Sequence, residues 1–243
     1  MSSTPIPDLD NASVGNGFKH TLGHLSSSFF IDLIKKGDSM SKPIACDGQS
    51  PFFGCRFSLY PMSDHFVPII LNAIEALKDS GLEVESGHIS TCVMGKEKDV
   101  FETLKRVFSL AASSEKHVVM SATFSKGCPG EGYVDVKSIQ PIHQHHEEGA
   151  HTHRKIDGEF SIYPLGHGNY MSAIYDVIDH INDMGIYDGS VHFATRLHGT
   201  IHDVFTGLEN VFETTTKVAS HTVMQVTLSA NSPSVKKGEH NHA

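Results

Sequence analysis

The stretch GCRFSLYPMSD at residues 54–64 recurs as GEFSIYPLGH at residues 158–167, and this recurrence decides the fold. The identical residues keep one offset along the chain, with Phe57 and Phe160, Ser58 and Ser161, Tyr60 and Tyr163, and Pro61 and Pro164 as pairs. After a one-residue insertion the correspondence continues to the end of both copies, pairing His88 with His192, Thr91 with Thr195, Val107-Phe108 with Val211-Phe212, and Thr123 with Thr227. A fixed internal period of this kind indicates a tandem duplication of one domain.

Each copy has the pattern of an α+β unit. Residues 55–60 alternate between apolar and polar, which predicts a half-buried strand. Helical spacing follows at 66–78, with Asp64 as the expected N-cap and Gly81 as the stop. Short strands at 82–85 and 89–94, a second helix capped by Asp99, and a strand at 117–124 complete the unit. The fold class expected is α+β, with tandem ferredoxin-like βαββαβ repeats and antiparallel sheets.

The expected domain limits follow from composition. Residues 51–130 form repeat 1 and residues 158–234 form repeat 2, with a His-rich connection at 131–157 between them. Residues 1–50 are a partly disordered leader in which 29–37 have the spacing of a short amphipathic helix, and residues 235–243 are a disordered tail.

Bulk properties narrow the class of protein. The 243 residues carry a formal net charge of −9, which argues against a nucleic-acid binder because such proteins need a basic face. No apolar run is long enough to span a bilayer, and the first residues lack the apolar core of a signal peptide. Four cysteines without CxxC spacing indicate neither a zinc site nor a disulfide framework. The default location is the cytoplasm.

Polar and aromatic residues at positions shared by both copies are the candidates for a ligand site. They are Ser58, Tyr60, Asp64, Thr91 and Thr123 in repeat 1, and Ser161, Tyr163, His167, Thr195 and Thr227 in repeat 2. The ferredoxin-like sheet has one face without helices, which two repeats or two subunits commonly cover against each other. Each residue also has an ordinary structural interpretation: the tyrosines as core aromatics, the threonines as strand residues and Asp64 as a helix cap.

No catalytic or cofactor-binding motif is present. The sequence has no GxSxG, HExxH or Walker loop. Cys92 with His88 or His117 could form a nucleophile and base, but repeat 2 has Arg196 where repeat 1 has Cys92, so only one copy could be active. The histidines at 143–153 favour adventitious metal binding over a selected site, because a flexible tract does not fix a coordination geometry. We therefore expect no enzyme activity, no cofactor and no dedicated metal ligand.

Four longer motifs resemble those of the YkoF family. They are GCRFSLYPMSD at 54–64, HISTCVMG at 88–95, HVVMSATFSKGCPG at 117–130 and TLSANSP at 227–233. The resemblance covers both repeats and is stronger in the first. It implies a ferredoxin-like tandem that binds thiamine or its hydroxymethylpyrimidine moiety, with one site per repeat and no catalysis. It further implies a homodimer and a link to uptake or salvage of the vitamin, with a thiamine-precursor transporter as a possible partner.

An aminopyrimidine is a flat ring that suits an apolar slot with polar groups at its rim. Tyr60, Met62, Ser63, Asp64 and Thr91 could supply these groups, and Cys92 lies beside Thr91. In repeat 2 Met62, Ser63 and Asp64 are replaced by Leu165, Gly166 and His167, and Cys92 by Arg196. Loss of a carboxylate and gain of a guanidinium should weaken the binding of a cation, so we expect the first site to bind more tightly.

Three alternatives stay open at the level of sequence. An amino-acid-sensing module of the ACT type has the same βαββαβ order. A metal-handling protein would use the His-rich tract. An enzyme acting on a thiamine derivative would need an activated nucleophile that the sequence does not reveal.

Overall fold

The computed structural model describes residues 53–127, 152–165 and 171–234. Within repeat 1 the elements are β1 (Phe53–Pro61), α2 (Phe66–Ile74) extended by the 3₁₀ turn η1 (Glu75–Leu77), β2 (Glu83–Ser86), β3 (Thr91–Gly95), α3 (Glu97–Ala112) and β4 (Val118–Lys126). This is the expected βαββαβ order. The expectations for the leader, for the C-terminal tail and for residues 131–151 of the His-rich connection concern residues outside the described ranges, as do two of the four cysteines, Cys46 and Cys128.

Repeat 2 has the same order of elements. These are β5 (Lys155–Leu165), α4 (Met171–Asp183), β6 (Tyr187–Val191), β7 (Ala194–Thr200), α5 (Ile201–Val218) and β8 (His221–Ala230). Strand β5 begins at Lys155, before the expected start at Gly158, because Lys155, Ile156 and Asp157 already pair with β7.

Two helix caps expected from the sequence are wrong. The N-cap of α2 is His65, which makes no side-chain cap hydrogen bond, and Asp64 lies one residue too early to reach the free N–H groups. The N-cap of α3 is Lys96, so Asp99 lies within the first turn, where its negative charge still favours the positive end of the helix. Among the α-helices whose N-cap residue is described, α5 alone has a side-chain cap, since Thr200 Oγ1 accepts a hydrogen bond from the Asp203 amide.

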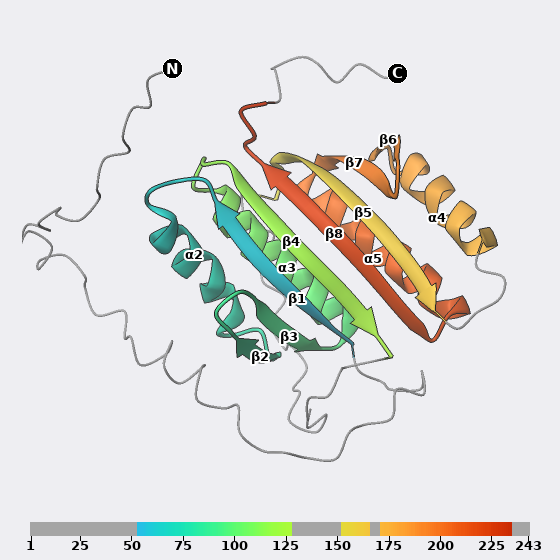
Figure 1. The fold of residues 1–243 in the computed structure, drawn as a ribbon, viewed down its shortest axis with the longest axis horizontal. Helices are drawn as coiled ribbons and strands as arrows, with labels where there is room; N and C mark the ends of the chain where they lie inside the picture. Colours follow the sequence, from blue (N-terminus) through green and yellow to red (C-terminus); the bar gives the residue numbers. More distant parts are fainter. Residues whose placement is uncertain (1–52, 128–151, 166–170, 235–243) are drawn as a thin grey trace, which may run out of the picture.

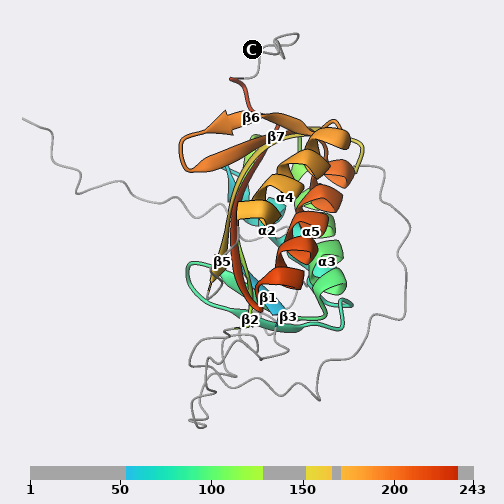
Figure 2. The ribbon, with the colours of Figure 1, turned by 90° about the vertical axis from the view of Figure 1, so that its right-hand side faces the viewer.

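The two repeats form one continuous sheet rather than two stacked sheets. Its strand order is β2-β3-β1-β4-β8-β5-β7-β6, and β4 pairs with β8 in antiparallel orientation. Figure 1 shows the eight strands side by side, and Figure 2 shows that the helices lie on one side of them. The repeats therefore do not cover each other's free sheet faces, and none of the described helices lies over the opposite face.

The two repeats are related by an internal two-fold axis, like the subunits of a symmetric dimer. Ala122 pairs with Val226, its own counterpart in the other repeat, and marks the axis. On either side of this pair the partners are reciprocal, because Thr123 pairs with Gln225 and Ser121 pairs with Thr227. Helices α3 and α5 pack against each other with the same reciprocity, since the Phe101–Phe212 and Phe108–Phe205 ring centroids lie 6.2 and 6.4 Å apart. Such reciprocal contacts define an isologous interface.

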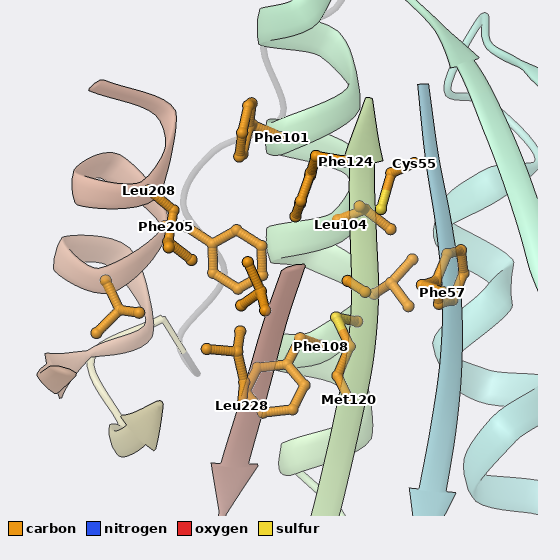
Figure 3. Packing of buried hydrophobic residues seen from close by; sticks show 14 of the residues in the cluster. Cys55, Phe57, Phe101, Leu104, Phe108, Met120, Phe124, Phe205, Leu208 and Leu228 are labelled. Carbon is orange, nitrogen blue, oxygen red and sulfur yellow. The ribbon is translucent and has the colours of Figure 1, made fainter. Parts of the chain in front are cut away.

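A single apolar core runs between the sheet and the helices of both repeats. Phe101 stacks on Phe124 with ring centroids 4.5 Å apart, and Phe53 lies 5.7 Å from Phe101. Phe212 of repeat 2 packs against the edge of Phe53 at 5.1 Å. Figure 3 shows side chains from both repeats meeting in this core, including Phe108 and Leu228. Each repeat therefore depends on the other for the burial of its aromatic residues.

Asn231 ties the end of β8 to repeat 1. Its side-chain amide donates to the carbonyls of Ala112 and Lys116, both at 2.9 Å, and its Oδ1 accepts from Arg154 at 2.6 Å. Asn231 has a left-handed backbone with φ of 57°, which asparagine tolerates better than most residues. The equivalent residue after β4 is Gly127, with φ of 94° and room for no side chain, because a Cβ would lie 2.6 Å from the Ser220 carbonyl oxygen.

Glu209 is on α5 near the charged residues of α3, and it should make stability depend on pH. Burial is the main cause that raises the pKa of its carboxyl; Lys98 and Lys105 oppose the rise, and Glu97 and Glu102 add to it. Because this pKa is higher in the folded chain than in the unfolded one, ionised Glu209 costs stability at neutral pH, and that cost disappears on acidification through the raised pKa.

We expect Glu209→Gln to raise the melting temperature at neutral pH by about 1–2 °C, since the carboxyl is only half buried. The gain should vanish at mildly acidic pH, where Glu209 is protonated. Thermal unfolding followed by circular dichroism at several pH values measures both effects, with Glu213→Gln on the exposed side of α5 as the control. A gain that is the same at every pH would contradict this account of Glu209.

Candidate functional site

The helix-free side of the sheet, which we call the open face, collects most of the candidate residues. The strand registers place Arg56 beside Cys92 on one side and Thr123 on the other, and they place Ser58 beside Ser121. The same argument places Ser161 beside Gln225 and Glu159 between Arg196 and Thr227. The residues that define the open face here are Arg56, Ser58, Tyr60, Cys92, Ser121 and Thr123 in repeat 1, and Glu159, Ser161, Tyr163, Arg196, Gln225 and Thr227 in repeat 2.

A hairpin turn folds toward the open face in each repeat. Ser58 Oγ donates to the Ile89 carbonyl at 2.9 Å in the β2–β3 turn, and Ser161 Oγ donates to the Phe193 carbonyl in the β6–β7 turn. In Figure 2 both hairpins extend past the sheet on the side away from the helices. The serine recurs in both repeats because it holds the hairpin turn in place. Each hydroxyl oxygen can still accept a hydrogen bond from a ligand.

Large apolar side chains border the open face at equivalent positions of the two repeats. Tyr60 and Tyr163 are 50% and 47% exposed. They are therefore not core aromatics, which was the structural interpretation that the sequence also allowed. At the turn tips Ile89 and Phe193 are 85% and 94% exposed. Aromatic surfaces of this kind, next to small polar side chains, are suited to stacking against a flat ring.

The turn after β1 presents Met62, Ser63 and Asp64 at the end of the strand. The Met62 amide donates to the His117 carbonyl at 2.8 Å, and Ser63 Oγ accepts from the His65 amide at 3.2 Å. These bonds fix the backbone, while the Met62 side chain is 60% exposed and Asp64 is exposed. A thioether and a carboxylate therefore lie beside the Tyr60 end of β1.

Thr91 and Thr195 do not join this group, which corrects the grouping made from the sequence. Thr91 pairs with Phe57 and Thr195 pairs with Phe160, and both phenylalanines are buried on the helix side of the sheet. The Thr91 hydroxyl is hydrogen bonded to Ser86 at 3.0 Å. The sequence pattern shows which residues are on strands, but a shift of one residue reverses the face. His167 is outside the described residues.

Cys92 lies on the open face between opposite charges. Burial is the main cause that raises the pKa of its thiol, with Arg56 opposing the rise and Glu85 and Glu83 adding to it. A thiol with a raised pKa stays protonated at neutral pH and is a poor nucleophile. Of its two possible bases, His117 is hydrogen bonded to Ser229 at 3.0 Å instead. The environment of Cys92 thus does not favour nucleophilic catalysis.

The open face of repeat 2 has different charges. Arg196 donates to the Asp188 carbonyl at 2.9 Å and lies 3.8 Å from its carboxylate, so the guanidinium is held toward β6. Gly189 makes room for it, because a Cβ there would lie 3.1 Å from the Arg196 Nη2 atom. Asp157 and His198 form a pair at 2.9 Å. The two repeats therefore present chemically distinct surfaces on the same scaffold.

Sequence reasoning missed three features of this surface. Arg56 is on the open face and donates to Ser90 at 3.1 Å, and Glu159 occupies its equivalent position in repeat 2. The alternation of residues 55–60 already placed Arg56 on the face of Tyr60, so that signal was present. The exposed tips Ile89 and Phe193 had no such signal, because an apolar residue in a turn looks like part of a strand.

Two absences hold for the described ranges. Among these residues there is no cluster of histidine, cysteine, aspartate and glutamate that could hold a metal ion. None of the described helices combines the length and apolar character needed to cross a membrane.

Comparison with known proteins assigns a family. The family described as "YKOF-related Family" matches residues 52–131 and 155–235, one match per repeat. The "Putative HMP/thiamine-binding protein YkoF" of Bacillus subtilis (strain 168) is 38% identical over 192 residues, which are 78% of this chain and 95% of that protein. A solved domain of unknown function, DUF77 from Bacillus cereus, is 22% identical over 32% of this chain and 78% of its own, with a TM-score of 0.28, too low to bear on fold or function. On the strength of the two matches and the Bacillus relative, the chain belongs to the YkoF-related family.

Proposed function

We propose that this protein binds thiamine or its hydroxymethylpyrimidine moiety without transforming it, with one site on the open face of each repeat. The observation that carries the proposal is the recurrence of a half-exposed tyrosine, Tyr60 and Tyr163, beside a hairpin tip in both repeats. The name of the Bacillus relative, an HMP/thiamine-binding protein, supports the same class of ligand.

The chemistry of the repeat 1 surface suits an aminopyrimidine. A flat ring can stack on Tyr60 and contact the Met62 thioether, both of which are exposed. The Thr123 hydroxyl and the Arg56 guanidinium lie on the same face and can serve ring nitrogens as hydrogen-bond donors. Small ligands are held in this way, by apolar surface and a few placed polar groups.

Carboxylates near this surface suit the cationic thiazolium of thiamine. Asp64 is exposed at the end of β1, and Glu85 pairs with Cys92 on the outer edge of the sheet. Repeat 2 offers Arg196 at the position of Cys92 and Leu165 at that of Met62. We therefore expect the two sites to differ in affinity, with the repeat 1 site tighter.

The proposal assigns no catalytic role to the chain. Burial raises the pKa of the Cys92 thiol, and this supports the assignment because a protonated thiol is a poor nucleophile. A binding protein of this kind would act in the cytoplasm as a homodimer, in uptake or salvage of the vitamin or its pyrimidine precursor, alone or with a transporter.

Asp64 gives the proposal a specific test. We expect Asp64→Asn to weaken thiamine binding at the repeat 1 site by about two- to fivefold, the range for an exposed ion pair. Folding should be unaffected, because Asp64 is exposed and does not cap α2. Isothermal titration calorimetry measures the change, with Asp79→Asn in the turn after η1 as the matched control. Equal affinity of the Asp64 variant and the wild type would remove Asp64 from the site.

A thermal-shift panel tests the ligand class as a whole. Thiamine, its phosphates and hydroxymethylpyrimidine should raise the melting temperature, because a ligand specific to the folded state stabilises it. Stabilisation by free amino acids and not by these compounds would favour a sensor of the ACT type and would contradict the proposal.

A further inference from the structure

We infer that the ligand site beside Tyr60 is completed by a carboxylate of the other repeat, Asp157, whose effect is controlled by its partner His198. The inference deepens the function proposed above and rests on it. Asp157 would make the Tyr60 site prefer thiamine, which carries a cationic thiazolium, over the free pyrimidine, which lacks it. This site, and not the one beside Tyr163, would lose affinity for thiamine when His198 takes up a proton.

One row of paired residues leads from Tyr60 across the open face to Asp157. Tyr60 on β1 pairs with Val119 on β4, which pairs with Ser229 on β8. Ser229 in turn pairs with Asp157 on β5. Residues paired in register point to the same side of a sheet, and three strand spacings, about 14 Å, separate the ends of this row. A ligand of two linked rings that lies beside Tyr60 can therefore place its second ring near Asp157.

Asp157 is held by a histidine on the neighbouring strand. Its Oδ1 atom lies 2.9 Å from Nδ1 of His198 on β7, the residue with which it pairs in register. The His198 side chain is only 18% exposed, whereas the Asp157 side chain is 39% exposed. The imidazole therefore fixes the orientation of a carboxylate that is open to a ligand. Because a carboxylate has two oxygens, the bond to His198 leaves it able to interact with a cation as well.

The equivalent row beside Tyr163 ends in uncharged residues. In order of pairing, this row consists of Tyr163, Val223, Ser125, Gly54 and Met94. Glycine and methionine thus occupy the places that Asp157 and His198 have in the first row. Gly54 is also closely packed, since a Cβ there would lie 2.9 Å from the Met94 Cγ atom. The two rows agree from the tyrosine to the serine and differ only at the end that carries the charge.

The protonation of His198 decides how the pair acts on a cation. Histidine is the side chain that ordinarily changes charge between about pH 5 and 8. While His198 is neutral, the pair carries the negative charge of Asp157 and attracts the thiazolium. Once His198 is protonated, the pair has no net charge and this attraction is lost. The affinity for thiamine should therefore fall on acidification and, by the same linkage, thiamine binding should release protons.

Other charged and titratable groups lie on the elements around this pair. They are Lys155 and Glu159 on β5, Asp188 on β6, Arg196 on β7, His202 and Asp203 in the first turn of α5, and His117 before β4. His117 is hydrogen bonded to Ser229 at 3.0 Å and so lies beside the row. Its counterpart His221 has the equivalent position at the Tyr163 end, so protonation of these two histidines acts on both sites. A difference in pH dependence between the sites points to His198.

Asp157→Asn tests the carboxylate, in a Tyr163→Ala background where titration calorimetry reports mainly the Tyr60 site. We expect thiamine binding at about pH 8 to weaken by about two- to fivefold, the range for a partly exposed ion pair. The affinity for hydroxymethylpyrimidine should not change, because this compound lacks the thiazolium. Asp183→Asn, exposed at the end of α4, is the matched control, and circular dichroism checks that the melting profile is unchanged. Equal weakening of both ligands, or of neither, would overturn the role of Asp157.

His198→Asn tests the control by the histidine. The asparagine amide can donate to Asp157 as the imidazole does, but it stays neutral at every pH. The variant should keep the thiamine affinity of the Tyr60 site at about pH 8 and lose the decrease, about two- to fivefold, that this site otherwise shows at about pH 6. Proton release, measured by titration in buffers of different ionisation enthalpy, should disappear as well. In a Tyr60→Ala background the remaining site should have the same pH profile with and without the substitution.

The outcomes separate this inference from the proposed function. A chain that binds thiamine with an affinity and pH profile unaffected by Asp157→Asn and His198→Asn would overturn the inference and leave the ligand proposal standing. A chain that binds neither thiamine nor hydroxymethylpyrimidine would reject the proposed function and the inference with it. Weaker binding of thiamine alone in the Asp157 variant, together with a flattened pH profile in the His198 variant, is the result that supports both.

Discussion

Replacing Phe101 with alanine is expected to lower the free energy of unfolding by about 3–5 kcal/mol, the usual cost of removing a buried aromatic side chain. Phe101 is 1% exposed and stacks on Phe124, and it also lies against Phe53 and against Phe212 of the other repeat. The cavity would open where both repeats contribute to one core, so both should become unstable together. Urea unfolding followed by circular dichroism measures the loss.

The matched control is Val67→Ala, on the exposed side of α2, where 51% of the side chain is exposed. Surface changes of this kind stay within about 0.5 kcal/mol. The Phe101 variant should still unfold in one transition, because the core is continuous. Two separate transitions, or a loss no larger than that of Val67→Ala, would contradict the view that the repeats form a single cooperative unit.

The second large effect concerns the ligand. Tyr60→Ala should weaken thiamine binding at the repeat 1 site by about tenfold, and Tyr163→Ala should do the same at the repeat 2 site. Each removes an aromatic ring that is half exposed on the open face, so stability should change little. Titration calorimetry of the two single variants and the double variant separates the contributions of the two sites.

Thr91→Val provides the control that decides which side of the sheet binds. Thr91 faces the helices opposite Phe57, so its replacement should leave thiamine affinity unchanged even if the lost hydrogen bond to Ser86 lowers stability slightly. If Thr91→Val weakened binding and Tyr60→Ala did not, the ligand would lie on the helix side of β3 and the open-face site would be wrong.

The order of strands and helices could be predicted from the sequence. Periodicity indicates the local structure of each segment, and the duplication shows that both repeats have the same order. The alternation at residues 55–60 fixed β1, and helical spacing fixed α2 and α3 to within a few residues. The helix starts were less accurate, since Asp64 and Asp99 have the chemistry of caps but the backbone turns at His65 and Lys96 instead. The pairing of β4 with β8 is a contact between distant residues and leaves no local signal.

The placement of the candidate residues on the sheet was predicted only in part for the same reason. Tyr60, Ser58 and Thr123 share a face as expected, because they occupy matching positions of paired strands. Thr91 was grouped with them although it lies on the other side, because its face depends on which residue of β1 it pairs with, and that pairing is with Phe57. Arg56 was missed although the alternation of residues 55–60 places it on the face of Tyr60, because the candidates were restricted to positions that both repeats share and Glu159 stands there in repeat 2.

Titration calorimetry of the unmodified chain with thiamine and with hydroxymethylpyrimidine tests the central claim most directly. We predict saturable binding with one site per repeat and unequal affinities, the tighter site being the one lost on Tyr60→Ala. No binding of either compound, or one site per chain that neither tyrosine variant affects, would contradict the claim.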